Sequence, residues 1–182
     1  MVEKDYWKYS ESMNSESFRD LMLTYGQDVW NYAFFMTRQA YLADDISQDV
    51  FFKAYSSIQT FRGEASIKTW LIAITRNIAI NYRRSAFMRK VILVERIFYK
   101  DSHPSAENEA LGCGQSHPIW DVVLKLPLKY REVLILDAKY ELTMKEMSSV
   151  LGISEGAVKS RLSRARQKVA AIWKEEPEYE QA

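Results

Sequence analysis

Six basic side chains lie between Ser154 and Lys174, a stretch in which the only acidic residue is Glu155. A helix places successive residues about 100° apart, so one side of this segment is apolar, with Val158, Leu162, Ala165, Val169 and Ile172. The opposite side and its flank carry Lys159, Ser160, Arg161, Ser163, Arg164 and Gln167. Basic groups neutralise phosphates, and polar side chains reach base edges in the major groove. This pattern predicts a helix that binds duplex DNA.

The residues before this segment predict that it is the second helix of a helix-turn-helix. Thr143, with Glu146 three positions later, forms a capping box that marks the start of a short helix. Gly152 can end that helix in the left-handed conformation, and Ser154 can cap the next one. A short helix, a tight turn and a basic helix are typical of major-groove docking. A solvated bundle helix and a helix on a membrane surface stay open as alternatives.

A second candidate DNA-binding set lies on the predicted helix from Ser66 to Arg84. One flank carries Trp70, Asn77 and Arg84, with the small Ala73 between them. A ring can stack on a base, an amide can bond to a base edge and arginine can neutralise a phosphate, which suits single-stranded nucleic acid. The preceding turn and cap complete the set with Phe61, Arg62, Gly63 and Ser66. The alternative is that Trp70 belongs to the core, because tryptophan is highly buried on average.

A third set indicates a protein partner. In a helix over residues 43–57, the inner side comprises Ile46, Val50, Phe51, Ala54 and Ile58. The outer side then carries Asp45, Gln48, Asp49 and Phe52. An aromatic side chain inside a polar rim is typical of an anchor in a protein interface. The alternative is that a neighbouring helix covers Phe52.

Helices must position all three sets, and the rest of the sequence predicts an all-α fold. Almost no segment alternates with the period of a strand. An apolar face on the first helix comprises Phe18, Leu21, Met22, Tyr25, Val29, Tyr32, Ala33 and Met36. The core stripe expected on the helix from Ser66 to Arg84 comprises Ile67, Leu71, Ile74, Ile78 and Tyr82. Segments 119–126 and 128–140 predict two helices that support the helix-turn-helix.

Proline, glycine and charge divide the chain into two small helical domains. Residues 101–118 hold two prolines, two glycines and a net charge of −3, whereas residues 18–90 and 119–174 carry +4 and +5. We predict a helical domain over 1–90, a flexible linker over 91–118, and a helix-turn-helix domain over 119–182 that ends in an acidic tail. Two basic blocks favour a polyanionic partner, although two solvated helical surfaces would give the same charge pattern.

Composition excludes several other classes of protein. A single cysteine, Cys113, excludes an intrachain disulfide. No stretch approaches the roughly 20 apolar residues of a membrane-spanning helix, and the N-terminal residues lack a secretory signal, so we expect a cytoplasmic protein. His103, Cys113 and His117 do not have the spacing of a known zinc site, and we predict no metal. The chain also lacks a phosphate-binding glycine-rich loop and a nucleophile motif, so we predict neither a cofactor nor catalytic activity.

Together the two blocks resemble a bacterial RNA polymerase sigma factor of the extracytoplasmic function (ECF) type, over residues 18–174. The first block is similar to sigma region 2 in ADDISQDVFFKAYSSIQTFRGEASIKTWLIAITRNIAINYRR. The second is similar to sigma region 4 in LPLKYREVLILDAKYELTMKEMSSVLGISEGAVKSRLSRAR. The two motifs in this order and at this spacing are more specific than either alone.

The resemblance implies partners and roles. The helix that carries Asp45, Gln48, Asp49 and Phe52 would bind the clamp helices of the polymerase β′ subunit. The set on Phe61–Ser66, Trp70 and Asn77 would capture a flipped base of the promoter −10 element, and the basic helix, chiefly Lys159, Ser160, Ser163 and Arg164, would read the −35 element. That helix and residues 128–140 would also meet the polymerase β flap. An anti-sigma factor is a further implied partner. The resemblance leaves open whether that factor is anchored in a membrane.

Two positions depart from the usual pattern of the family. Asn81 stands where many members have aspartate, which removes a charge near the basic end of the helix. Lys159 stands where many have arginine, and lysine lacks the planar fork that reads guanine with two hydrogen bonds. The runner-up interpretation of the whole chain is a stand-alone helix-turn-helix regulator, which would need dimer symmetry to bind two half-sites. A structural helical bundle that does not bind DNA is a third.

Overall fold

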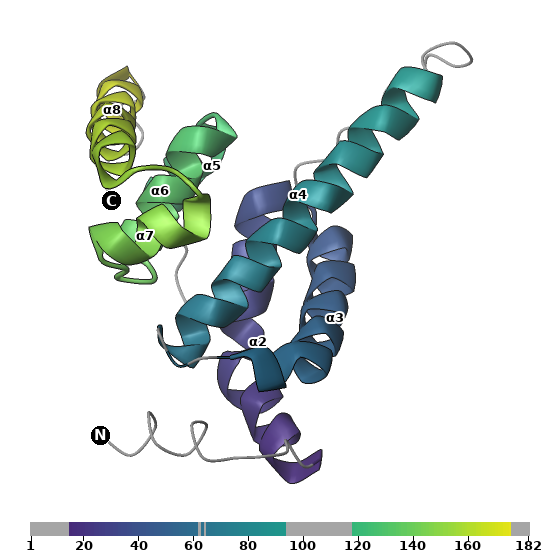
Figure 1. Cartoon of the computed structure of the whole chain (residues 1–182). Helices are drawn as coiled ribbons and strands as arrows, with labels where there is room; N and C mark the ends of the chain where they lie inside the picture. Colours follow the sequence, from purple (N-terminus) through teal and green to yellow (C-terminus); the bar gives the residue numbers. More distant parts are fainter. Residues whose placement is uncertain (1–14, 62, 64, 94–117, 176–182) are drawn as a thin grey trace. The chain divides into compact units, whose positions relative to one another are not determined.

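The structure, a computed structural model, describes residues 15–61, 63, 65–93 and 118–175, and every regular element in these ranges is helical (Figure 1). This confirms the predicted all-α fold. Contacts divide the chain into two compact units, residues 1–110 and 111–182, and the boundary falls inside the predicted linker. Among the described helices, none has both the length and the apolar character needed to span a membrane.

The first unit contains α2 (Ser15–Thr37), α3 (Ala40–Ser57), the 3-10 turn η1 (Ile58–Thr60) and α4 (Ile67–Leu93). The three long helices pack against one another, and their core includes Leu21, Val29, Tyr32, Ile46, Val50 and Leu71. Met22 was predicted on the inner face, but it is 38% exposed. The preceding residue, Leu21, is fully buried, and Met22 lies about 100° further around the helix, at the edge of the buried face.

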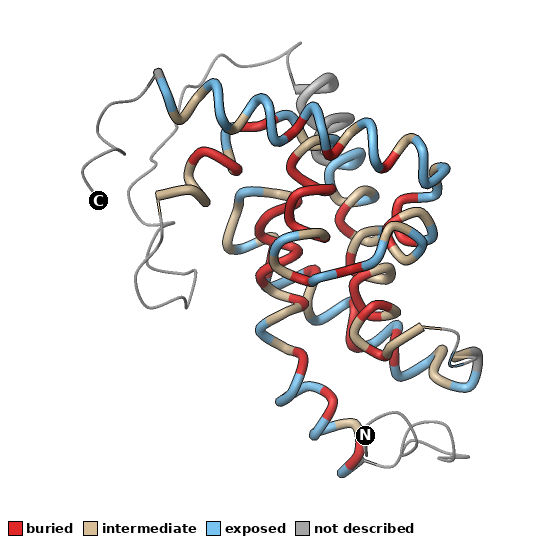
Figure 2. The backbone as a smooth tube through the Cα atoms, turned by 90° about the vertical axis from the view of Figure 1, so that its left-hand side faces the viewer, coloured by how far each residue is buried: buried red, intermediate tan, exposed pale blue. Residues whose placement is uncertain are grey.

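Helix α4 differs from the prediction in its length and in the face that it buries. It continues past Arg84 to Leu93, since no proline or glycine stops it there. Its buried face is centred on Leu71, Ile72, Thr75 and Ala79. Ile74 and Ile78, which we expected in the core stripe, are half-buried, and exposed and buried residues alternate along the described helices (Figure 2). Thr75 can lie in the core because its hydroxyl donates to the carbonyl of Leu71 at 2.8 Å.

Three polar contacts cross-link the helices of the first unit near its surface. They join Trp30 Nε1 to Asp44 Oδ1 at 2.7 Å, Lys68 Nζ to Asp28 Oδ2 at 2.9 Å, and the Tyr82 hydroxyl to Asp49 Oδ2 at 2.7 Å. Each contact is at least partly exposed to water, so its contribution to the free energy of unfolding is modest. Each also fixes how two helices lie against each other.

The second unit contains α5 (Ile119–Lys125), α6 (Leu128–Ala138), α7 (Met144–Leu151) and α8 (Glu155–Glu175). α8 packs against the other three helices. The core of the unit includes Val122, Val133, Leu136, Met147, Val158 and Leu162. Arg131 is also buried, and its Nη1 donates to the carbonyl of Leu124 at 2.9 Å, which ties α6 to the end of α5.

Candidate nucleic-acid interface

The caps and turn between α7 and α8 have the predicted helix-turn-helix geometry. Thr143 Oγ1 accepts from the amide of Glu146 at 3.3 Å, and the Glu146 carboxylate accepts from the amide of Thr143 at 2.9 Å. Gly152 ends α7 with φ of +65°, the left-handed region that favours glycine. Ser154 Oγ accepts from the amide of Ala157 at 3.3 Å and caps α8. These hydrogen bonds and the Gly152 conformation confirm the predicted capping box and turn. Both features were predictable because each depends on residues close in sequence.

Helix α8 buries the predicted apolar stripe and exposes the predicted polar face. Val158, Leu162 and Ala165 are 0–3% exposed, while Val169 and Ile172 are half-buried towards the end of the helix. The exposed side chains are Lys159, Ser160, Ser163, Arg164 and Gln167, with Arg161 half-buried at the edge of that face. A helix of this kind presents a continuous polar surface of the width that a major groove accepts.

Two cations on the flanks of α8 are engaged within the unit. Arg166 Nη2 lies 2.8 Å from Asp137 Oδ2 on α6. Lys168 Nζ lies 5.7 Å from the centroid of the Tyr130 ring, within the range of a cation–π contact. Both contacts join α8 to α6, so these side chains help to hold the helix in position.

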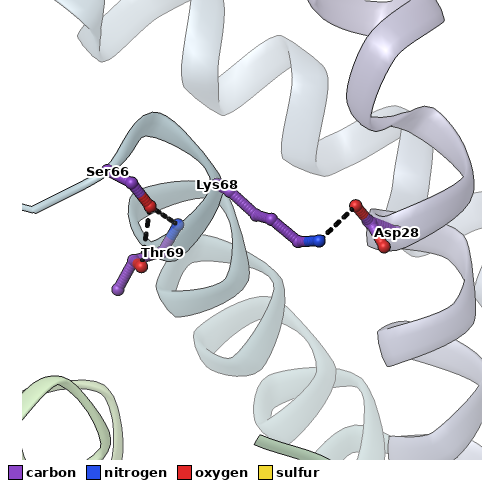
Figure 3. A network of polar contacts seen from close by, with 4 residues as sticks. All are labelled: Asp28, Ser66, Lys68 and Thr69. Carbon is purple, nitrogen blue, oxygen red and sulfur yellow. Dashed lines mark hydrogen bonds and ion pairs between the residues drawn. The ribbon is translucent and has the colours of Figure 1, made fainter. Parts of the chain in front are cut away.

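The second candidate DNA-binding set begins at the N-terminus of α4 (Figure 3). The Ser66 hydroxyl accepts from the amide of Thr69 at 3.0 Å and lies 2.9 Å from the Thr69 hydroxyl, which confirms the predicted cap. Two residues after Ser66, Lys68 is paired with Asp28 of α2, and this pair anchors the start of α4 to the bundle. Gly63 has φ of +68°, so the tight turn expected from this glycine is also present. Arg62, assigned to the same set, lies outside the described residues.

Trp70 packs against a second aromatic ring at the start of α4. It is half-buried, and its ring centroid lies 5.3 Å from that of the half-buried Phe61, with 48° between the ring planes. Asn77 and Arg84, on the same flank of α4, are exposed. Trp70 is therefore partly, but not fully, buried. The structure brings together two aromatic rings, an amide and a guanidinium along one side of a single helix and its preceding turn.

The third set lies on α3, where Asp45, Gln48 and Asp49 are exposed and Phe52 is 76% exposed. The alternative that a neighbouring helix covers Phe52 is wrong. Sequence reasoning missed Tyr41 and Tyr55, which are 64% and 53% exposed. Together with the predicted residues they form an exposed line along α3, which we call the α3 stripe and which comprises Tyr41, Asp45, Gln48, Asp49, Phe52 and Tyr55.

The spacing of the α3 stripe contained the missing signal. Tyr41 precedes Asp45 by four residues and Tyr55 follows Phe52 by three, so both continue one line along the helix surface. The predicted helix began at residue 43, whereas α3 begins at Ala40, so Tyr41 fell outside it, and Tyr55 was not assigned to either side. Three exposed aromatic side chains on one face mark a surface that another molecule can cover.

The three residues considered for a metal site fall outside the described residues. His103, Cys113 and His117, for which we predicted no metal site, lie between residues 94 and 117. Asn81, which departs from the pattern of many sigma factors, is exposed on α4.

Comparisons with known proteins match both units. Residues 21–86 match the model of "Sigma-70 region 2", and residues 116–169 match that of "Sigma-70, region 4". The RNA polymerase sigma factor YlaC of Bacillus subtilis is 33% identical over 153 residues, which cover 83% of this chain and 88% of YlaC. The ECF RNA polymerase sigma factor SigM of the same organism is 31% identical over 149 residues, covering 82% of this chain and 90% of SigM.

A solved structure shares the fold. The sigma factor RpoE of Bartonella quintana, crystallised with the anti-sigma factor NepR, superposes with a TM-score of 0.70 over 87% of this chain and 98% of that one, at 24% identity.

Proposed function

The chain belongs to the ECF family of RNA polymerase sigma factors, and from this premise we propose which surfaces carry the function. It binds core RNA polymerase through the α3 stripe, reads the −35 element as duplex through α8, and captures the −10 strand through the start of α4. The observation that carries the proposal is the presence, on one three-helix unit, of an exposed aromatic stripe and a separate aromatic and polar flank.

The spacing of the α3 stripe supports docking to a helical partner. Tyr41, Asp45, Gln48, Phe52 and Tyr55 follow one another at alternating steps of four and three residues. A side-chain row with this spacing runs nearly parallel to the helix axis and is the row that packs along a second helix. Clamp helices of the polymerase β′ subunit, the partner implied by the family, have that form. The exposed aromatic rings would serve as anchors, with the carboxylates at the rim.

The arrangement at the start of α4 supports capture of an unpaired base. The rings of Trp70 and Phe61 already contact each other in the free protein. Stacking of a base on them therefore costs less side-chain conformational entropy than stacking on two freely rotating rings. Asn77 is exposed and can donate to and accept from a base edge, and Arg84 is exposed further along the same flank. Stacking and edge bonds together return part of the free energy lost when a base leaves the duplex.

The polar face of α8 supports reading of duplex DNA by a helix in the major groove. Ser160, Ser163 and Arg164 lie in the first half of α8, which is the half that reaches base edges in helix-turn-helix proteins. Arg164 can bond to guanine with two hydrogen bonds, whereas Lys159 is better suited to a phosphate. Arg161, at the edge of the face, is placed for the DNA backbone.

The alternative of a stand-alone regulator is not favoured, because such a protein has no use for the α3 stripe or for a single-strand reader. In the proposed role the chain performs no bond chemistry of its own, since polymerase makes the RNA, and it acts where polymerase acts, in the cytoplasm. RpoE of Bartonella quintana was crystallised with an anti-sigma factor, and we propose a partner of this class here. Such a partner would prevent transcription if it covered the α3 stripe.

Competition for core polymerase, followed by promoter-dependent transcription, tests the proposed function. The full chain should displace a labelled sigma factor from core enzyme and should direct run-off transcription from a cognate promoter but not from a promoter with a replaced −10 element. A chain that binds a palindromic duplex tightly without polymerase, and does not compete for core, would instead be a regulator.

A further inference from the structure

We propose that Tyr82 is a positioning residue for the polymerase-binding surface: its hydroxyl holds the Asp49 carboxylate and ties the docking helix α3 to the DNA-reading helix α4. The inference rests on the proposed function, because it takes the α3 stripe as the surface that meets polymerase. Tyr82 belongs to α4 and is not part of the stripe itself.

The contact joins a fixed donor to an exposed acceptor. The Tyr82 hydroxyl donates to Asp49 Oδ2 at 2.7 Å, across 33 residues of sequence. Tyr82 is half-buried, on the side of α4 that also carries the buried Leu71 and Thr75, so packing restrains its ring. A phenol has few rotatable bonds, and hydrogen bonds to a carboxylate are stronger than those between neutral groups. The restrained Tyr82 ring therefore sets the position of the more flexible Asp49 carboxylate.

Asp49 differs in this respect from its neighbours on the α3 stripe. In the described part of the structure, the side chains of Asp45 and Gln48 make no such bond with another helix. An exposed aspartate without a partner samples several rotamers and must lose that freedom when it meets a binding surface. The hydrogen bond from Tyr82 already restrains the Asp49 side chain in the free protein, so less rotamer entropy is lost when polymerase binds.

The same bond lies opposite the DNA-reading flank of α4. At about 100° per residue, Tyr82 is about 140° around the helix from Asn77. One side of α4 thus rests on α3 through Tyr82, while the other side presents Asn77 to solvent. Polymerase binding and strand capture therefore use helices that this bond joins, in addition to the packing of α3 against α4.

A double-mutant cycle on the full chain tests the inference, with affinity for core polymerase measured by competition. Tyr82→Phe removes the hydroxyl and keeps the ring. We expect it to weaken core binding by about twofold to tenfold, the range for restoring freedom to one side chain. In an Asp49→Ala background the same change should have no further effect, because the acceptor is already gone.

Asp28→Asn provides the matched control, since it weakens another polar link of α4, the ion pair between Lys68 and Asp28 of α2. We expect this variant to bind core polymerase as the wild type does. If Asp28→Asn weakens core binding as much as Tyr82→Phe, or if Tyr82→Phe is equally harmful with and without Asp49, the role of Tyr82 is only structural and the inference is overturned. Tighter binding by Tyr82→Phe would also overturn it, because the bond would then compete with polymerase for Asp49.

Failure of this inference and failure of the proposed function give different results. Phe52→Ala, measured in the same competition, reports on the stripe without involving Tyr82. Loss of binding by Phe52→Ala together with full binding by Tyr82→Phe rejects the positioning role alone. Full binding by Phe52→Ala rejects the α3 stripe as the docking surface and the inference with it.

Discussion

Replacing Phe52 by alanine should weaken binding to core RNA polymerase without changing the stability of the free protein. Phe52 is 76% exposed in the middle of the α3 stripe. Complete burial of a phenylalanine side chain is worth about 1.5–3 kcal/mol, so covering the exposed three quarters contributes about 1–2 kcal/mol. We therefore expect the dissociation constant for core polymerase to rise by about 5-fold to 30-fold.

Leu23→Ala is the matched control for this prediction. Leu23 is 73% exposed but lies on α2, outside the α3 stripe. Both substitutions remove a large apolar side chain from an exposed helix position, and alanine favours the helix in both. Thermal unfolding of the free protein should therefore change little in either variant, by less than about 0.5 kcal/mol. Only Phe52→Ala should lose affinity in competition with a labelled sigma factor for core enzyme.

Two results would refute this reasoning. Competition by Phe52→Ala within about twofold of the wild type, a difference of less than about 0.5 kcal/mol, would mean that polymerase does not cover the ring. Alternatively, Leu23→Ala could lose as much affinity as Phe52→Ala, in which case general surface apolarity rather than the α3 stripe determines binding.

Three further predictions concern DNA and stability. In the holoenzyme, Trp70→Ala should impair promoter opening more than initial duplex binding and be partly rescued on a template with a pre-melted −10 bubble; normal permanganate reactivity on intact duplex would contradict this. Arg164→Ala should lower −35 affinity by about 1–3 kcal/mol relative to random duplex, whereas Arg161→Ala should weaken all sequences alike and reduce the salt slope by about 1; footprint titrations distinguish the two. Thr143→Ala should lower the free energy of unfolding by about 1 kcal/mol in urea titration, and Thr143→Ser should retain most of the stability, unless the capping box is not formed in solution.

The parts of this fold that the sequence predicts correctly are those fixed by neighbours along the chain. The capping box of Thr143 and Glu146, the left-handed Gly152 and the cap at Ser66 each involve residues within a few positions of one another. Their geometry follows from local hydrogen bonding, and tertiary packing changes it little. The polar face of α8 was predictable for a related reason, because a helical repeat fixes which side chains share a side.

The parts that were missed depend on packing between helices. The contact between Tyr82 and Asp49 joins residues 33 positions apart, and helical periodicity only placed Tyr82 in a core stripe. The burial of Thr75 depends on a hydroxyl satisfied by its own helix, a possibility that counting apolar residues ignores. Tyr41 was missed because the predicted helix began at residue 43, whereas α3 begins at Ala40, and helix starts are hard to locate without a clear cap.

The distribution of cations on α8 bears on why a protein of this kind would depend on polymerase. Arg166 is paired with Asp137 and Lys168 lies over Tyr130, so the cations that α8 offers to DNA are mainly Lys159, Arg161 and Arg164 in its first half. Each neutralised phosphate contributes about −0.9 to the slope of log affinity against log salt, so three contacts give a slope of only about −3. Such a helix has modest non-specific affinity for DNA. Specific promoter binding then requires the −35 and −10 readers to act together, and attachment of both units to one polymerase supplies the effective concentration that makes this possible.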